Sequence, residues 1–129
     1  MKYILDTNVV VDLLRRKVRF KEEFLEEGSG ISVITRGELV YGAYKSDRPK
    51  ENLRLIKGLI VEARLQVLDI NEEIIDRFGE LKVELEQQGR RLEDFDLLIA
   101  ATAINLGLTL VTSNVKHFAR IKGLKMLTV

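Results

Sequence analysis

The sequence predicts an α/β fold, a three-layer α/β/α domain in which a short parallel sheet lies between helices. Short apolar runs, the first of them Tyr3-Ile4-Leu5, alternate with longer segments whose apolar residues recur at helical spacing. This alternation is typical of a parallel sheet covered by helices on both faces. A length of 129 residues suits one compact domain, residues 1–129.

The first part of the chain predicts two strands and two helices. Tyr3-Ile4-Leu5 is an apolar run that ends at a carboxylate, which indicates a buried strand. Helices are expected over residues 7–14 and 20–27, the second ended by the turn Gly28-Ser29-Gly30. The largely β-branched run 31–34 predicts the second strand.

The middle of the chain predicts two helices and a third strand. Thr35 begins a helix that reaches about residue 44. Pro49 suits the first position of the next helix, whose apolar residues recur at helical spacing over residues 51–64. Val67-Leu68 fits a third strand.

The last part predicts a long helix, an apolar helix and two more strands. Asn71 suits the cap of a helix that Gly89 ends, with one apolar face made of Ile74, Ile75, Phe78, Leu81 and Leu85. Asp94 caps a helix that is apolar on nearly every side and ends at Gly107. A strand, a short helical turn and an edge strand follow over residues 108–111, 114–119 and 126–128.

The composition excludes several classes of site. The chain has no cysteine, which excludes a disulfide framework, a thiolate zinc site and a cysteine nucleophile. Its single histidine, His117, excludes sites built on several imidazoles. No apolar run approaches a membrane span or a signal-peptide core, so we expect a cytoplasmic protein without membrane association. A net charge of +1 identifies no partner.

Four acidic residues stand at the ends of expected strands or at helix starts. Asp6 directly follows the first strand, where it also suits a helix N-cap. Glu38 lies in Thr35-Arg36-Gly37-Glu38, which matches the capping box in which the glutamate bonds back to the cap. Asp94 and Asp96 lie at the start of the apolar helix, where negative charges interact favourably with the helix dipole. Asp94 suits the cap better, which leaves Asp96 with less structural reason to be acidic.

The predicted topology brings these groups to one edge of the sheet. Parallel sheets bind ligands beyond the carboxyl ends of their strands, where Asp6 and Glu38 are expected. The helix from Asp94 runs back along the strand 108–111, so its start lies near Thr112, Ser113 and Asn114. Three or four carboxylates at one edge are hard to explain by helix capping alone.

A hard divalent cation would relieve the repulsion between these carboxylates. Without one, at least one carboxylate should have a raised pKa. Mg²⁺ prefers oxygen ligands, and Mn²⁺ accepts the same ones. Such a site can activate water and stabilise charge on a phosphoryl group. The chain has no phosphate-binding Gly-x-x-x-x-Gly-Lys loop and no evident Ser–His pair, so we expect metal-assisted hydrolysis, most consistently of a phosphodiester.

Four motifs, in order along nearly the whole chain, resemble a PIN-domain ribonuclease of the VapC toxin type. They are Leu5-Asp6-Thr7-Asn8, Thr35-x-x-Glu38-Leu39, Asp96-Leu97-Leu98-Ile99-Ala100-Ala101-Thr102-Ala103 and Gly107-Leu108-x-Leu110-Val111-Thr112-Ser113-Asn114-x-x-His117-Phe118. The resemblance implies a Mg²⁺- or Mn²⁺-dependent endoribonuclease that acts on RNA, forms a homodimer and is silenced by a VapB-type antitoxin.

The resemblance also implies roles for individual residues. Asp6, Glu38 and Asp96 would be the catalytic, metal-binding acids. Thr7 and Asn8 would support Asp6 through hydrogen bonds, and Thr112 and Ser113 would shape the pocket. The family often has a fourth acid where this chain has Asn114, whose carbonyl can bind a metal but adds no charge. This argues against a second tightly held metal, unless Asp94 supplies the charge.

Other interpretations and contacts follow from the same residues. The main alternative is a PIN-like module that binds RNA or protein without cutting. A receiver-like phosphate acceptor fits less well, because Asp6 is followed by Thr7-Asn8 and not by the expected acidic pair. His117 is read as a structural or surface residue. Five basic residues are candidates to hold the RNA backbone, namely Arg15, Arg16, Arg36, Lys45 and Lys116.

Two further expectations concern surfaces. Aromatic residues are few, five Phe and three Tyr, so we expect base stacking not to dominate RNA binding. The apolar faces of the helices between Phe20 and Tyr44 exceed what a core of this size needs. By the resemblance, part of that surface should bind the antitoxin and part should form the dimer.

Overall fold

The computed structural model describes all of residues 1–129 and confirms the α/β fold with a parallel sheet. The five strands are all parallel and lie in the order β3-β2-β1-β4-β5. They are β1 (Tyr3–Leu5), β2 (Ser29–Ser32), β3 (Gln66–Leu68), β4 (Thr109–Thr112) and β5 (Met126–Thr128). The helices are α1 (Thr7–Leu14), α2 (Glu22–Glu26), α3 (Val33–Lys45), α4 (Pro49–Glu62), α5 (Glu72–Gln87), α6 (Asp94–Leu106) and α7 (Val115–Phe118). No helix combines the length and the apolar character that crossing a bilayer demands.

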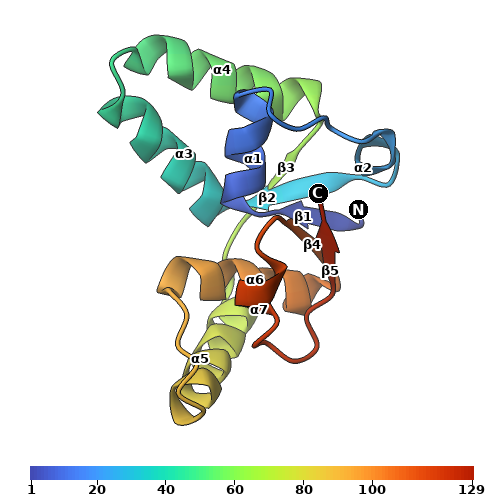
Figure 1. Cartoon of the computed structure of the whole chain (residues 1–129), viewed down its shortest axis with the longest axis vertical. Coiled ribbons are helices and arrows are strands. Elements are labelled where there is room, and N and C mark those ends of the chain that lie inside the picture. Colours follow the sequence, from blue (N-terminus) through green and yellow to red (C-terminus); the bar gives the residue numbers. More distant parts are fainter.

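The helices form two layers, one on each face of the sheet. Figure 1 shows α1, α3 and α4 on one side and α5 and α6 on the other, with β1 at the centre. Since successive side chains of a strand point to opposite faces, the central strands contribute to two cores. Ile4 and Leu110 pack with α5 and α6, whereas Leu5 and Val111 pack with α1, α3 and α4.

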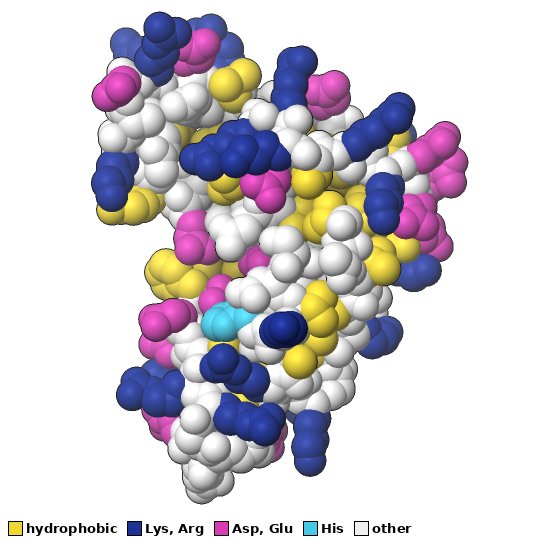
Figure 2. All heavy atoms as spheres, viewed as in Figure 1, with side chains coloured by type: hydrophobic (Ala, Val, Ile, Leu, Met, Phe, Trp, Pro, Cys, Tyr) yellow, Lys and Arg dark blue, Asp and Glu magenta, His cyan; other side chains and the backbone are white.

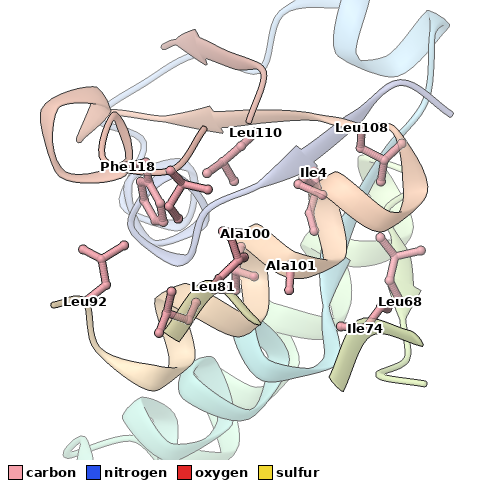
Figure 3. Packing of buried hydrophobic residues seen from close by; sticks show 14 of the residues in the cluster. Ile4, Leu68, Ile74, Leu81, Leu92, Ala100, Ala101, Leu108, Leu110 and Phe118 are labelled. Carbon is pink, nitrogen blue, oxygen red and sulfur yellow. The ribbon is translucent and has the colours of Figure 1, made fainter. Parts of the chain in front are cut away.

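The core beneath α6 explains why this helix is apolar on nearly every side. Figure 3 shows Ile4 and Leu110 of the sheet directed at Ala100 and Ala101 of α6. The opposite side of α6 packs against α5. Small alanines let the helix lie close to the sheet, and a helix covered on both sides has little room for polar residues. The start of α6, which is buried only from Leu97 onward, is thereby held at the edge of the sheet where β1 and β4 end.

The boundary between β2 and α3 differs from the prediction by two residues. The strand ends at Ser32, whose Oγ accepts a hydrogen bond from the Ile34 N–H at 3.0 Å and so caps α3. Val33 is already helical and 37% exposed, so the β-branched pair Val33-Ile34 does not extend the strand. The predicted capping box is therefore wrong, because Thr35 lies inside the helix and does not cap it. Ser29 and Gly30, expected in a turn, belong to β2.

Two other expectations are also corrected. Glu93, and not Asp94, is the N-cap of α6, and it forms no side-chain capping bond. Asp94 is the first helical residue, and its Oδ1 accepts from Lys82 Nζ at 2.9 Å. Ile75 is 49% exposed and lies outside the buried face of α5. The Asn71 cap is confirmed, since its side chain accepts from the Ile74 N–H at 2.9 Å.

Candidate active site

Asp6 lies at the centre of the sheet edge and uses both carboxylate oxygens. It directly follows β1, and it is 4% exposed. Its Oδ1 accepts from the Thr7 N–H at 2.8 Å and thereby caps α1, while its Oδ2 accepts from Thr112 Oγ1 at 2.9 Å. The helix-cap interpretation of Asp6 is confirmed, and the oxygen that caps α1 is not the one that faces β4.

The charge of Asp6 is not fully compensated. Burial raises the pKa of Asp6 above its ordinary value, and the negative charges of Asp96 and Glu38 raise it further. The hydrogen bonds from Thr112 and the Thr7 N–H oppose that rise. The raised pKa of Asp6 therefore reflects first the burial of its carboxylate and then the two acidic neighbours at this edge of the sheet.

Glu38 reaches the same edge from α3 and is held by Thr7. The Thr7 hydroxyl donates to Glu38 Oε1 at 2.7 Å and is also 2.9 Å from the hydroxyl of Thr35. Glu38 is half-buried, and Thr35 is fully buried. Thr7 thus contacts both acids, Asp6 through its backbone N–H and Glu38 through its side chain.

Asp96 comes from the first turn of α6 and is paired with the only histidine. His117 Nε2 lies 2.9 Å from Asp96 Oδ2, and both side chains are partly exposed. The ring of His117 also packs edge-on against Phe118, with the ring centres 5.2 Å apart. The sequence reading of His117 as a structural or surface residue missed this contact, because no local pattern links a residue in α7 to one in α6.

The remaining expected site residues lie at the edge but make fewer contacts. Asn8, Ser113 and Asn114 are exposed, and the hydrogen bond expected from Asn8 to Asp6 is not formed. The Asn114 N–H donates to Thr112 Oγ1 at 3.0 Å, so it helps orient the hydroxyl that contacts Asp6. Asp94 is turned toward Lys82, which neutralises its charge.

A pocket opens between the N-terminal parts of α3 and α6. It has a volume of about 420 Å³ and is lined by Glu38, Glu93, Asp94, Phe95 and Asp96. Figure 2 shows acidic side chains above and beside the histidine in the hollow between the two layers, and basic side chains on the other side of the histidine. Phe95 is 53% exposed in this pocket, an apolar ring among carboxylates that sequence reasoning did not single out.

A second groove adjoins the pocket at Glu38. It holds about 300 Å³ and runs between α1, α3 and α4, with Thr7, Arg15 and Glu38 among its lining residues. The far part of this groove is apolar, with Leu14, Leu55 and Ile56 on its walls. Glu38 therefore stands where an acidic pocket meets a largely apolar groove.

The donor set suits a hard divalent cation, although it is not arranged as a finished cage. Carboxylate oxygens in partly buried surroundings are the ligands that Mg²⁺ and Mn²⁺ prefer. Burial, together with the charges of Asp96 and Glu38, disfavours the ionised form of Asp6, and a nearby cation would favour it. No three Asp, Glu or His side chains are grouped closely enough to hold a metal as they stand. Glu38 and Asp96 each have one carboxylate oxygen engaged, Glu38 Oε1 by Thr7 and Asp96 Oδ2 by His117.

Comparison with known proteins agrees with this architecture. The PIN domain family matches residues 3–124. A tRNA(fMet)-specific endonuclease VapC from Shigella flexneri is 38% identical over 128 residues, with 97% of this chain and 96% of the relative covered. The DNA-bound VapBC structure from Salmonella typhimurium superimposes with a TM-score of 0.92 at 35% identity, covering 99% of this chain and 98% of that one.

A further solved structure gives the same result. VapBC2 from Rickettsia felis, bound to a DNA fragment from its promoter, has a TM-score of 0.88 at 32% identity and covers 100% of this chain and 99% of that one. The family match covers residues 3–124, and the alignments with the relative and the two solved structures cover nearly the full length of both proteins compared. The chain therefore belongs to the PIN-domain family, among the VapC ribonucleases.

Proposed function

We propose that this protein is a Mg²⁺- or Mn²⁺-dependent endoribonuclease whose metal is held by Asp6, Glu38 and Asp96. The observation that carries the proposal is the convergence of these three carboxylates, from β1, α3 and α6, at the carboxyl edge of the sheet, with Asp6 buried and its pKa raised. A bound cation would supply an activated water and neutralise charge on the scissile phosphate. The chain is a VapC-type toxin ribonuclease by family, and the fold supports that activity.

The other residues of the site act on these acids. Thr112 and the Thr7 N–H hold the two oxygens of Asp6 and favour its ionised form. The Thr7 hydroxyl orients Glu38, and His117 orients Asp96. Each of these two acids uses only one oxygen on its donor, Glu38 Oε1 and Asp96 Oδ2, so the other oxygen of each carboxylate is left for a cation.

RNA is proposed to reach the acids across the pocket between α3 and α6. An acidic pocket repels a phosphate backbone, so cationic side chains such as Arg15, Arg36 and Lys116 must hold the strand beyond it. Exposed Phe95 offers a ring on which an unpaired base can stack beside Asp96. We place this activity in the cytoplasm, where RNA substrates are found.

Substitution of the exposed Phe95 would test whether RNA crosses the pocket between α3 and α6. Phe95→Ala should weaken binding of a short single-stranded RNA about tenfold or more, because base stacking is lost. Phe95→Tyr should keep the affinity. Fluorescence anisotropy in the Asp6→Asn background would measure binding without cleavage. Equal affinities for the alanine variant and its parent would exclude a base on Phe95.

The protein is also proposed to form a homodimer and to bind a VapB-type antitoxin. The related structures from Salmonella and Rickettsia are VapBC complexes. On this chain, Tyr41 and Tyr44 are each 66% exposed on α3, and the apolar groove between α1, α3 and α4 is open. Sizing experiments over a range of concentrations would test the dimer.

Cleavage of a mixed cellular RNA pool by the partner-free protein tests the activity. We expect cleavage with Mg²⁺ or Mn²⁺, none with EDTA, and none with Asp6→Asn or Asp96→Asn. Arg120→Ala, in which the substituted side chain bonds only the carbonyl of Arg91, serves as the matched folded control. In-line attack by water predicts 5′-phosphate and 3′-hydroxyl ends. Metal binding by folded protein without cleavage would favour a non-cutting RNA- or protein-binding module.

A further inference from the structure

We infer that Thr35 is a positioning residue that acts on Glu38 through Thr7. This inference rests on the proposed metal-dependent activity and adds to it a residue that touches neither metal nor RNA. Its basis is a chain of two hydrogen bonds, from the Thr35 hydroxyl to the Thr7 hydroxyl at 2.9 Å and from there to Glu38 Oε1 at 2.7 Å.

The donor and the acceptor of each of these two hydrogen bonds follow from the number of hydrogens on the hydroxyl groups. A hydroxyl carries one hydrogen, and a carboxylate oxygen can only accept. The Thr7 hydrogen is used on Glu38, so the Thr7 oxygen must accept the hydrogen of Thr35. Thr35 therefore donates, Thr7 both accepts and donates, and Glu38 receives a hydroxyl that cannot turn away without breaking both bonds.

The surroundings of Thr35 give its hydroxyl no other use. Thr35 is fully buried, and its only side-chain hydrogen bond is the one to Thr7. A buried threonine in a helix commonly bonds the carbonyl four residues earlier, as Thr102 of α6 does with Leu98 at 2.7 Å. Thr35 sits in the first turn of α3, where the chain four residues earlier is still strand β2. A valine would fill the same volume, so the hydroxyl serves the contact and not the packing.

The position of these two hydrogen bonds explains how they could hold Glu38 in place. Thr35 comes from the start of α3 and Thr7 from the start of α1, which follow the neighbouring strands β2 and β1. The two bonds join the ends of these strands at the point where Glu38 must face Asp6. Partners of metal ligands commonly change metal affinity 10- to 100-fold when removed. Since Thr35 acts one bond farther out, we expect about a tenfold loss.

The test compares Thr35→Val with Thr102→Val. Both substitutions remove a hydroxyl from a fully buried helical threonine and keep its shape, but only the first breaks the path to Glu38. We expect Thr35→Val to weaken Mn²⁺ binding about tenfold, measured on RNA-free protein by calorimetry or by electron paramagnetic resonance of free Mn²⁺. Thr102→Val should bind Mn²⁺ like the wild type. Thr35→Ser, which restores the hydroxyl, should recover most of the affinity.

The steady-state kinetics should show the same separation. Thr35→Val should lower kcat and leave the KM for RNA unchanged at saturating Mn²⁺, because the RNA surface is intact. If valine prevents folding, Thr35→Ala removes the same hydroxyl from a smaller side chain. Equal Mn²⁺ affinity in the folded Thr35 and Thr102 variants, while the wild type binds and cleaves, would overturn this inference alone. A wild type that binds no Mn²⁺ would overturn the proposed function and this inference with it.

Discussion

At the scale of single residues, Asp6 shows how one side chain meets a structural and a chemical demand. One oxygen caps α1 and the other faces Thr112, so neither demand displaces the other. Its burial is the consequence of position, since it directly follows the central strand β1. The cost of that burial is a carboxylate whose ionised form is disfavoured when no cation is present.

The raised pKa of Asp6 predicts a pH dependence of stability in EDTA. The folded pKa exceeds the unfolded value near 3.8, so the folded state binds the extra proton. The resulting stabilisation is fully present below the unfolded pKa and is lost as the pH rises through the folded pKa. Urea unfolding of wild type and Asp6→Asn across this range should give a difference that shifts in favour of the variant as the pH rises. A difference that does not depend on pH would contradict the raised pKa of Asp6.

The contact between His117 and Asp96 predicts a second effect. His117→Ala should lower the cleavage rate about tenfold, because Asp96 loses the group that orients it. His117→Gln keeps a donor and should retain more of the rate. Single-turnover cleavage of a short RNA at fixed pH would measure both. Equal losses in the two variants would show that the ring, and not its hydrogen bond, is what matters.

The candidate acids could be predicted from sequence, while their partners could not. Asp6 and Glu38 follow consecutive strands and Asp96 opens an apolar helix, so topology alone brings them to one edge. His117 meets Asp96 only because α7 folds back over the start of α6, and no local pattern encodes that path. Phe95 was not singled out, and Thr35 was interpreted only as a helix cap, because side-chain exposure and hydroxyl direction depend on tertiary placement.

At the scale of elements, the most instructive difference is the boundary between β2 and α3. Ser32 and Thr35 are both suitable caps, and Val33 and Ile34 both favour strands. Ser32 caps because Ser29 and Gly30 already pair with Tyr3 and Ile4, which moves the strand two residues earlier. Gly28 and Gly30 had suggested a turn at this point of the sequence. One of them, Gly30, is instead required by close packing within the sheet.

The close packing around Gly30 predicts how substitutions of this glycine change stability. A Cβ there would lie 2.8 Å from the Gln66 carbonyl oxygen and 3.1 Å from Leu68 Cδ1, so β2 and β3 would have to separate. Gly30→Ala should destabilise the protein by about 1–3 kcal/mol. Gly58→Ala, on an exposed and open position of α4, should instead stabilise it by roughly 0.5–1 kcal/mol. Urea unfolding of both variants would check the opposite signs.

At the scale of the whole molecule, the site belongs to neither helical layer alone. Glu38 comes from the layer of α1, α3 and α4, and Asp96 comes from α6 on the opposite face. Figure 1 shows the two layers meeting at the sheet edge beside the starts of α1 and α6. A ligand shared by these acids would therefore connect both layers as well as their common sheet.

Metal binding should consequently stabilise the entire fold. At a hundred times its Kd, Mn²⁺ should add about 2.7 kcal/mol to the free energy of unfolding. For a domain of this size the Tm should rise by several degrees, on the order of 10 °C. Calorimetric scans with Mn²⁺ and with EDTA would measure the shift, and Asp6→Asn and Asp96→Asn should abolish it. An unchanged wild-type Tm at saturating metal would contradict a site that joins the layers.

The bond between Asp6 and Thr112 spans 106 residues, and this separation matters while the protein is being made. The central strand β1 is synthesised first, but its neighbour β4 is among the last elements to leave the ribosome. Until then Asp6 lacks its partner hydroxyl, and His117, which contacts Asp96, has not yet been synthesised. A nascent polypeptide therefore carries no assembled nuclease beside the messenger and transfer RNAs that are producing it.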